Sequence, residues 1–172
     1  VQNGQYVTRY NSPAITELTN GNLVISYDGV TDLYPGDNSW GVTATILAPS
    51  GAVVKNQFQL HGAVNNGQYE PKIASMSNGG FVVAYENTAT YSSWQVTGRT
   101  FNSDGTPTRN EVALHGGIGA MKPDLVGLNN GGILAVWHNV ISNDISARIF
   151  DNMLNPITNE VVINSSNTNQ SY

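Results

Sequence analysis

Aromatic residues stand beside polar loops at two equivalent places in this sequence. Trp40 and Trp94 occupy matching positions, and Tyr34 and Tyr91 lie in the loops just before them. An aromatic ring can stack on the C–H face of a sugar while nearby polar groups bond its hydroxyls, and binding residues concentrate on loops held by a rigid scaffold. These four residues are therefore candidates for a glycan-binding face. The competing interpretation is that both tryptophans pack between structural units.

Hydrogen-bonding side chains recur at the ends of three similar segments. His61 ends "FQLH", His115 ends "VALH", and Asn164 stands at the same place in "VVIN". A zinc site needs three or four ligands that converge on one ion, whereas repeat-equivalent residues lie on separate units. The simpler interpretation is that they cap strand ends. His61, His115 and Asn143, which replaces the tryptophans in the third segment, also join the candidate glycan ligands.

The longest insertion, "YDGVTDLYPGDNSWG" at 27–41, is acidic and rich in glycine and asparagine. It carries Asp28, Asp32 and Asp37. Hard cations bind several oxygens at close range, and such a loop can supply them, although no glutamate stands at the twelfth position of an EF-hand. Calcium is the candidate ion for these aspartates, with a solvated turn as the alternative. No cofactor is otherwise expected.

The sequence lacks the short motifs of nucleophilic catalysis. It has no Gly-x-Ser-x-Gly segment and no cysteine, so neither a serine elbow nor thiolate chemistry is indicated. Asp104-Gly105 resembles part of a sialidase Asp-box but lacks the aromatic residue, and it is interpreted as a turn. The acidic residues stand mostly at turn positions, which does not favour a glycosidase carboxylate pair. On these grounds the sequence predicts that the chain is not an enzyme.

A threefold repeat supplies the elements that would position these residues. Each unit opens at a proline (Pro13, Pro71, Pro123), continues through an alternating segment to an Asn-Gly turn, and enters an apolar strand spelled "LVISY", "FVVAY" or "ILAVW". Asn-Gly between two such runs predicts a hairpin with a type I′ turn, in which both central residues have positive φ. Two further strands follow in each unit.

Four short antiparallel strands in about 50 residues match the period of a propeller blade. A β-sandwich would not explain three nearly equal units. The predicted fold is all-β, with three four-stranded antiparallel propeller-like blades in a single repeat domain. The units run over 11–62, 70–116 and 122–164, with connectors at 1–10, 63–69, 117–121 and 165–172.

Three blades fall short of the four to eight that propellers contain, and unpaired blade faces would leave apolar patches in water. We therefore expect a second copy to complete a six-bladed ring, or the chain to belong to a longer array. The first residue is Val1 rather than methionine, from which we expect a processed or excised segment.

The amino-acid composition limits the classes of binding partner that the chain can have. Hydrophobic residues make up 40% and charged residues 11%, with a formal net charge of −5 and no basic run. This balance argues against nucleic acid or an anionic membrane as partner, and no stretch is long enough for a membrane span. The Asn-, Thr-, Ser- and Gly-rich polar character is typical of exported bacterial proteins and predicts an extracellular or cell-surface location.

The repeat also resembles a known class. The pattern P-x-I-x-x-L-x-N-G-G-F-V-V-x-Y/W, followed by V-x-A-R-x-F, is similar to tandem repeats of large bacterial RTX-adhesin and hemolysin-type secreted surface proteins. The match is clearest at Pro71–Phe101 and Pro123–Phe150. The glycine-rich calcium-binding nonapeptide of RTX tails is absent. The resemblance implies a propeller-like surface repeat with a role in adhesion or glycan contact.

Together these observations predict a non-enzymatic carbohydrate-binding or adhesion module of a secreted bacterial protein. Its expected partners are a glycan or host-surface ligand and a second copy of the chain. One alternative is a structural or oligomerising repeat without a ligand of its own. Another is an accessory domain of an extracellular enzyme.

Overall fold

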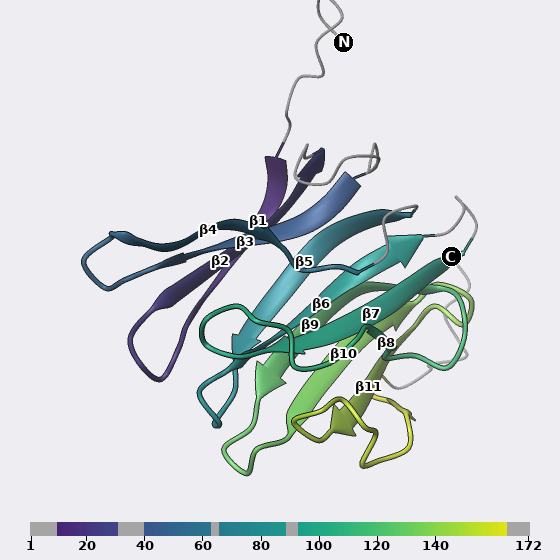
Figure 1. The fold of residues 1–172 in the computed structure, drawn as a ribbon. Coiled ribbons are helices and arrows are strands. Elements are labelled where there is room, and N and C mark those ends of the chain that lie inside the picture. The colour runs from purple at the N-terminus through teal and green to yellow at the C-terminus, as the bar shows by residue number, and fades with distance from the viewer. Residues whose placement is uncertain (1–9, 31–39, 63–65, 89–92, 165–172) are drawn as a thin grey trace, which may run out of the picture.

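The computed structural model describes residues 10–30, 40–62, 66–88 and 93–164. These residues form three four-stranded antiparallel sheets and no helix, which confirms the predicted all-β class and its propeller-like blades (Figure 1). They contain no helix of the length and hydropathy that a membrane crossing needs. We call the sheets units 1, 2 and 3, in chain order.

The strands of each unit follow one another in space as they do in the chain. Unit 1 contains β1 (Tyr10–Glu17), β2 (Leu23–Val30), β3 (Trp40–Leu47) and β4 (Val53–Gln59). Unit 2 contains β5 (Gly67–Ser75), β6 (Phe81–Thr88), β7 (Trp94–Phe101) and β8 (Val112–Ala113). Unit 3 contains β9 (Ala120–Gly127), β10 (Ile133–Asn139), β11 (Asp144–Phe150) and β12 (Val161–Val162). Each first strand begins inside a segment that the sequence predicted as connector.

The Asn-Gly hairpins form, but their turn type differs from the type I′ turn expected. Only the glycine has positive φ, at 82° for Gly21, and the backbone nitrogen of Gly21 donates to the Leu18 carbonyl at 2.8 Å. The Leu18 nitrogen in turn donates to the Asn22 carbonyl at 2.8 Å. This is a three-residue loop in which a type I turn is followed by a left-handed glycine. The asparagine instead accepts a hydrogen bond, from Asn22 nitrogen to Asn20 Oδ1 at 3.0 Å.

The three sheets stack face to face with their first strands adjacent. Strand β5 packs against β1, β2 and β3 of unit 1, and β9 packs against β5, β6 and β7 of unit 2. Figure 1 shows the resulting fan, with unit 1 at one side and unit 3 at the other. Unit 2 is therefore covered on both faces, whereas each outer unit has one face that no other unit of this chain covers.

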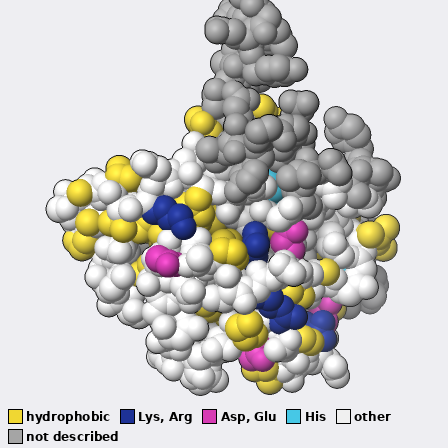
Figure 2. All heavy atoms as spheres, in the orientation of Figure 1, with side chains coloured by type: hydrophobic (Ala, Val, Ile, Leu, Met, Phe, Trp, Pro, Cys, Tyr) yellow, Lys and Arg dark blue, Asp and Glu magenta, His cyan; other side chains and the backbone are white. Residues whose placement is uncertain are grey.

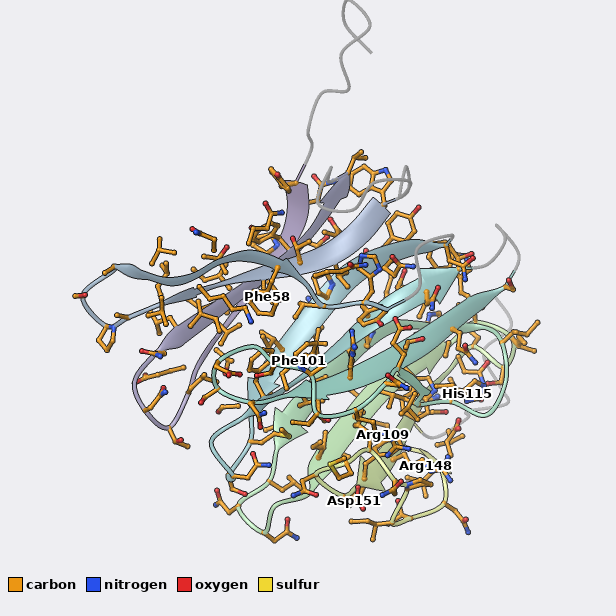
Figure 3. All side chains as sticks on the ribbon, in the orientation of Figure 1. Phe58, Phe101, Arg109, His115, Arg148 and Asp151 are labelled. Carbon is orange, nitrogen blue, oxygen red and sulfur yellow. The ribbon has the colours of Figure 1, made fainter. Side chains whose placement is uncertain are left out.

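Two apolar cores fill the junctions between the units. Residues of β6 alternate between them: Phe81, Val83 and Tyr85 enter the core shared with unit 1, whereas Val82 and Ala84 enter the core shared with unit 3. All five are fully buried, as expected for a central strand that reads apolar on both faces. Within the first core the Phe81 ring stacks on Phe101 at 4.9 Å. Figure 3 shows Phe58 of unit 1 pointing toward Phe101, with ring centroids 6.4 Å apart.

Long basic side chains tie each unit to the next at the outer strands. Lys55 Nζ donates to the Asp104 carbonyl at 2.9 Å, and Arg109, at the equivalent position of unit 2, donates to the Met153 carbonyl. Arg109 also donates to Asn155 Oδ1 at 2.8 Å. Figure 2 shows Lys and Arg side chains spread across this face, over all three units. The apolar stacking is thus reinforced at both internal junctions by a basic side chain that donates to a backbone carbonyl of the next unit.

Candidate functional site

Trp40 and Trp94, the two tryptophans singled out in the sequence, lie in one aromatic cluster. Tyr69 stands between them: its ring centroid is 5.9 Å from Trp40, nearly parallel, and 5.7 Å from Trp94, tilted by 60°. All three side chains are half-buried. We call these three residues the aromatic cluster. It combines an open ring surface with a fixed arrangement, which is what a stacking site requires.

Strand pairing places the cluster at one end of the sheets. Trp40 and Trp94 are the first residues of β3 and β7, where they pair with Val30 and Thr88 at the ends of the preceding strands. Tyr69 pairs with Glu86 near the same end of unit 2. Packing of β5 against β3 then brings Tyr69 to Trp40 across the junction. Trp40 and Tyr69, which belong to different units, thus meet because the two units stack.

Buried carboxylates stand at the same strand ends. Asp28 is 2% exposed and Glu86 is 3% exposed, and they occupy equivalent positions in β2 and β6. Asp28 Oδ2 accepts the backbone N–H of Glu70 at 2.7 Å, and Glu86 Oε1 accepts that of Lys122 at 2.6 Å. Each acceptor therefore bonds the residue before the opening proline of the next unit.

The donors sit in β-bulges. The register of the first strand shifts between Tyr69 and Lys72 in unit 2 and between Met121 and Asp124 in unit 3, and unit 1 has the same shift between Asn11 and Ala14. The residue before each opening proline has positive φ: 49° at Ser12, 50° at Glu70 and 50° at Lys122. A non-glycine residue in this conformation is strained. The buried carboxylate holds it in place through a charge-assisted hydrogen bond.

Glu86 has a perturbed pKa. Burial raises its pKa, the hydrogen bond from Lys122 opposes that change, and the negative charges of Glu70 and Asp28 add to the increase. A carboxyl that keeps its proton at higher pH than usual can act as a proton donor. The cluster of rings and this carboxyl lie at one end of unit 2, since Glu86 pairs with Tyr69. The Glu86 carboxyl itself is buried against Lys122 at the junction with unit 3.

The histidines lie apart, as their repeat positions required. His61 is 3% exposed, and its Nδ1 lies 2.9 Å from the side-chain amide of Gln59. His115 Nδ1 instead lies 2.8 Å from Glu160 Oε2 of unit 3. Asn143 is found in the turn before β11, where its Oδ1 bonds His138 Nε2 at 3.1 Å. The His61 ring lies against Gly41, the residue after Trp40, where an added Cβ would stand 2.4 Å from its Nε2. The assignment of the three residues as glycan ligands stays a prediction.

Two of the candidate aromatic residues and two of the candidate metal ligands lie outside the described residues: Tyr34, Tyr91, Asp32 and Asp37. The third candidate ligand, Asp28, uses Oδ2 for Glu70, and its buried Oδ1 has no hydrogen-bond partner within the described ranges. In that part of the chain no three His, Cys, Asp or Glu side chains gather as metal ligands. Calcium at the acidic loop therefore stays a prediction.

No protein-family model and no curated protein sequence matches the chain. Solved structures do match its fold. A Hadza microbial sialidase matches with a TM-score of 0.59 and 13% identity, over 81% of this chain and 34% of that one. An exo-β-1,3-galactanase from Clostridium thermocellum matches with a TM-score of 0.58 and 13% identity, over 92% of this chain and 38% of its own.

A third match is a structure of the GH130 family, whose description names glycoside hydrolases that target β-1,2 mannosidic linkages. It has a TM-score of 0.57 and 12% identity, over 92% of this chain and 50% of that one. The chain thus spans half or less of the length of these three structures. At such identities the likeness shows a shared fold.

These matches correct one expectation from the sequence. The chain was predicted not to be an enzyme because no short catalytic motif is present, yet the folds that resemble it are those of a sialidase, a galactanase and glycoside hydrolases. The two carboxylates of a glycosidase are defined by their separation in space, which a linear motif search does not detect. The absence of a motif is therefore no argument against catalysis here.

Sequence reasoning also missed Tyr69. The residue was assigned to the connector "NNGQYEP" at 65–71, although the same tyrosine occurs in "NGQYV" at 3–7. That recurrence was the available signal, because a connector that only spans two units has no need of a repeated aromatic residue.

Proposed function

We propose that this chain is a carbohydrate-recognising part of a β-propeller, and that the aromatic cluster is its sugar-stacking surface. The observation that carries the proposal is the stack of Trp40, Tyr69 and Trp94 across the junction of units 1 and 2. The glycoside hydrolases that share the fold support a carbohydrate-related role. The chain would belong to a secreted or surface-exposed bacterial protein in contact with glycans, as the resemblance of its repeats implied.

The chemistry of the cluster suits a sugar better than a purely apolar ligand. Its rings offer faces for the C–H groups of a sugar. Tryptophan and tyrosine keep a polar edge as well, so they bind amphipathic ligands at low entropic cost. The half-buried state of the rings leaves area that a ligand can cover.

Binding can be measured through tryptophan fluorescence. The chain has three tryptophans, and Trp137 is 1% exposed in the core between units 2 and 3. A change in emission on addition of an oligosaccharide therefore reports on Trp40 and Trp94. Oligosaccharides of galactose, mannose and sialic acid, the chemistries of the matched structures, are the first probes.

Variants decide whether the cluster is responsible. We expect Trp40→Ala, Tyr69→Ala and Trp94→Ala each to weaken binding about tenfold or more, a loss of about 1.4 kcal/mol. Trp94→Phe is the matched control, because it keeps a ring face, and it should lose less affinity than Trp94→Ala. Unchanged affinity in all three alanine variants would sink the proposal.

Glycoside hydrolysis is the second candidate function. It is favoured by the raised pKa of the buried Glu86 carboxyl, a property of general acids in such enzymes. Chromogenic glycosides of the same three sugars test it. Release of the chromophore that Glu86→Gln abolishes would support catalysis, and release that the variant leaves unchanged would remove Glu86 from the reaction.

A further inference from the structure

The outer face of unit 1 repeats a surface that is buried elsewhere in the chain. Ile15, Ile25 and Tyr27 stand at this face, and Ile15 pairs with Ile25. In unit 2 the same positions hold Ile73, Val83 and Tyr85, which lie in or against the core shared with unit 1. Ile15 is 62% exposed, whereas Val83 and Tyr85 are 0% exposed. The outer face is thus built like half of an internal junction.

The outer face of unit 3 repeats the opposite half. Its apolar residues are Val126, Leu134, Val136 and Ile145. Val126 is 48% exposed and Ile145 is 39% exposed, while their unit 2 equivalents Ala74 and Val96 belong to the core shared with unit 3. The chain therefore presents both complementary halves of one junction, one at each end of the stack.

The polar residues of the two outer faces also complement each other, although they differ from those at the internal junction. At the junction of units 2 and 3, His115 Nδ1 lies 2.8 Å from Glu160 Oε2. The position of His115 is held by Asn164 in unit 3, and that of Glu160 by Gln57 in unit 1. An ionisable pair is thus replaced on both sides at once by two amides, which can donate to and accept from each other.

The outer faces also carry residues that can form the hydrogen bond seen between the β-bulge N–H and the side chain at the end of the second strand. His138 occupies the position of Asp28 and Glu86, and Ser12 occupies that of the bulge donors, with φ 49°. His138 Nε2 lies 3.1 Å from Asn143 Oδ1. A neutral imidazole has one acceptor nitrogen, which can take the place of the carboxylate oxygen as a partner for the Ser12 N–H. A hollow of about 380 Å³, lined by Tyr10, Asn11, Pro13, Tyr27 and Gln57, lies beside Ser12.

We propose that the outer face of unit 3 in one chain packs on the outer face of unit 1 in a second copy, and the reverse, so that two chains close one ring of six units. The new junctions continue the arrangement already present twice in each chain. Three of the matched single-chain structures are covered by this chain over 50% or 51% of their length, so they contain about twice as much chain. Closure through two identical junctions gives a finite particle rather than a fibre.

The mass in solution tests the proposal. Light scattering on the chain should give about twice its mass of 18.4 kDa. We expect Ile25→Glu on unit 1 and Val136→Glu on unit 3 each to convert the dimer to a monomer, because either charge enters both junctions of the ring. Asn129→Glu, at an exposed turn tip, is the matched control and should stay dimeric. Far-UV circular dichroism confirms that each variant is folded.

Mixing distinguishes the head-to-tail arrangement from other dimers. An equimolar mixture of the two glutamate variants retains one unaltered junction per pair, since the unit 3 face of the Ile25→Glu chain and the unit 1 face of the Val136→Glu chain are wild type. We expect dimers to reappear in the mixture at higher protein concentration. A wild-type monomer, a larger array, or a dimer that either variant leaves intact would overturn the proposal.

Discussion

Asp28 Oδ2 lies 2.7 Å from the backbone nitrogen of Glu70, and the same bond recurs one unit later between Glu86 and Lys122. In both cases an acid at the end of a buried strand binds the strained residue before a proline in the following unit. Neither acid is held by a salt bridge among those found for the described residues. Burial of these carboxylates is thus explained by backbone donors, and the bond links one unit to the next.

Removing the Glu86 acceptor should destabilise the chain. We expect Glu86→Ala to lower the free energy of unfolding by about 1–3 kcal/mol, because the Lys122 N–H loses its partner inside a junction. Glu86→Gln keeps an acceptor oxygen and should cost less than Glu86→Ala. Urea denaturation of both variants measures the difference. Equal losses would show that the acceptor is not what matters at this position.

The raised pKa of Glu86 gives a pH dependence of defined sign. Burial is the main cause of the increase from the ordinary value of 4.5, so the folded chain holds this proton more tightly than the unfolded chain. Its contribution to the unfolding free energy is full below pH 4.5 and is lost as the pH rises through the folded-state pKa. The difference in stability between wild type and Glu86→Gln should therefore shift against wild type over that interval. A flat difference from pH 4 to 8 would contradict the assignment.

At Leu154, substitution by glycine should destabilise the chain less than substitution by alanine. It has φ 59° at the position that Gly51 and Gly105 hold in the other units, and its side chain is 0% exposed in the core between units 2 and 3. Both Leu154→Ala and Leu154→Gly lose that packing, at about 2–5 kcal/mol. Glycine also relieves the positive φ, by about 1 kcal/mol. We expect Leu154→Gly to melt at a higher temperature than Leu154→Ala, and the reverse order would be evidence against backbone strain.

Alanine substitution at Gly80 and at Gly51 should destabilise the chain for different reasons. A Cβ at Gly80 would stand 2.2 Å from the Phe101 carbonyl oxygen, whereas at Gly51 it would meet nothing within 4 Å but would sit at φ 84°. We expect Gly80→Ala to cost about 1–3 kcal/mol through displaced backbone, and Gly51→Ala about 1 kcal/mol through strain alone. Thermal melting of the pair tests the ranking. A Gly80→Ala variant as stable as wild type would mean that β6 and β7 separate there without cost.

Local chemistry made the strands and hairpins predictable. Asn20-Gly21 and its two counterparts stop one strand and start the next wherever they occur, so the number of units and their class follow from the sequence. The type of turn was harder to predict from the sequence. Asn20 keeps negative φ and accepts a side-chain hydrogen bond, an alternative that the dipeptide alone does not distinguish from a type I′ turn.

The site depended on contacts between units. From the sequence, Trp40 and Trp94 were equivalent residues on separate blades, and packing between blades was the favoured interpretation of both. Stacking of β5 on β3 inserts Tyr69 between them, and no periodicity within one unit indicates which residue of the next unit arrives there. The role of Asp28 likewise depends on unit 2, because the Glu70 N–H donates a hydrogen bond to one of the Asp28 carboxylate oxygens.

The sequence by itself determined the all-β class, the three-unit repeat and the hairpins, because turn residues and strand alternation act over a few neighbouring positions. Only the tertiary structure decided which aromatic rings meet, which carboxylates are buried and which faces remain uncovered. Those properties arise where one sheet packs on another, between residues tens of positions apart, and the energy that selects them comes from burial across the junction.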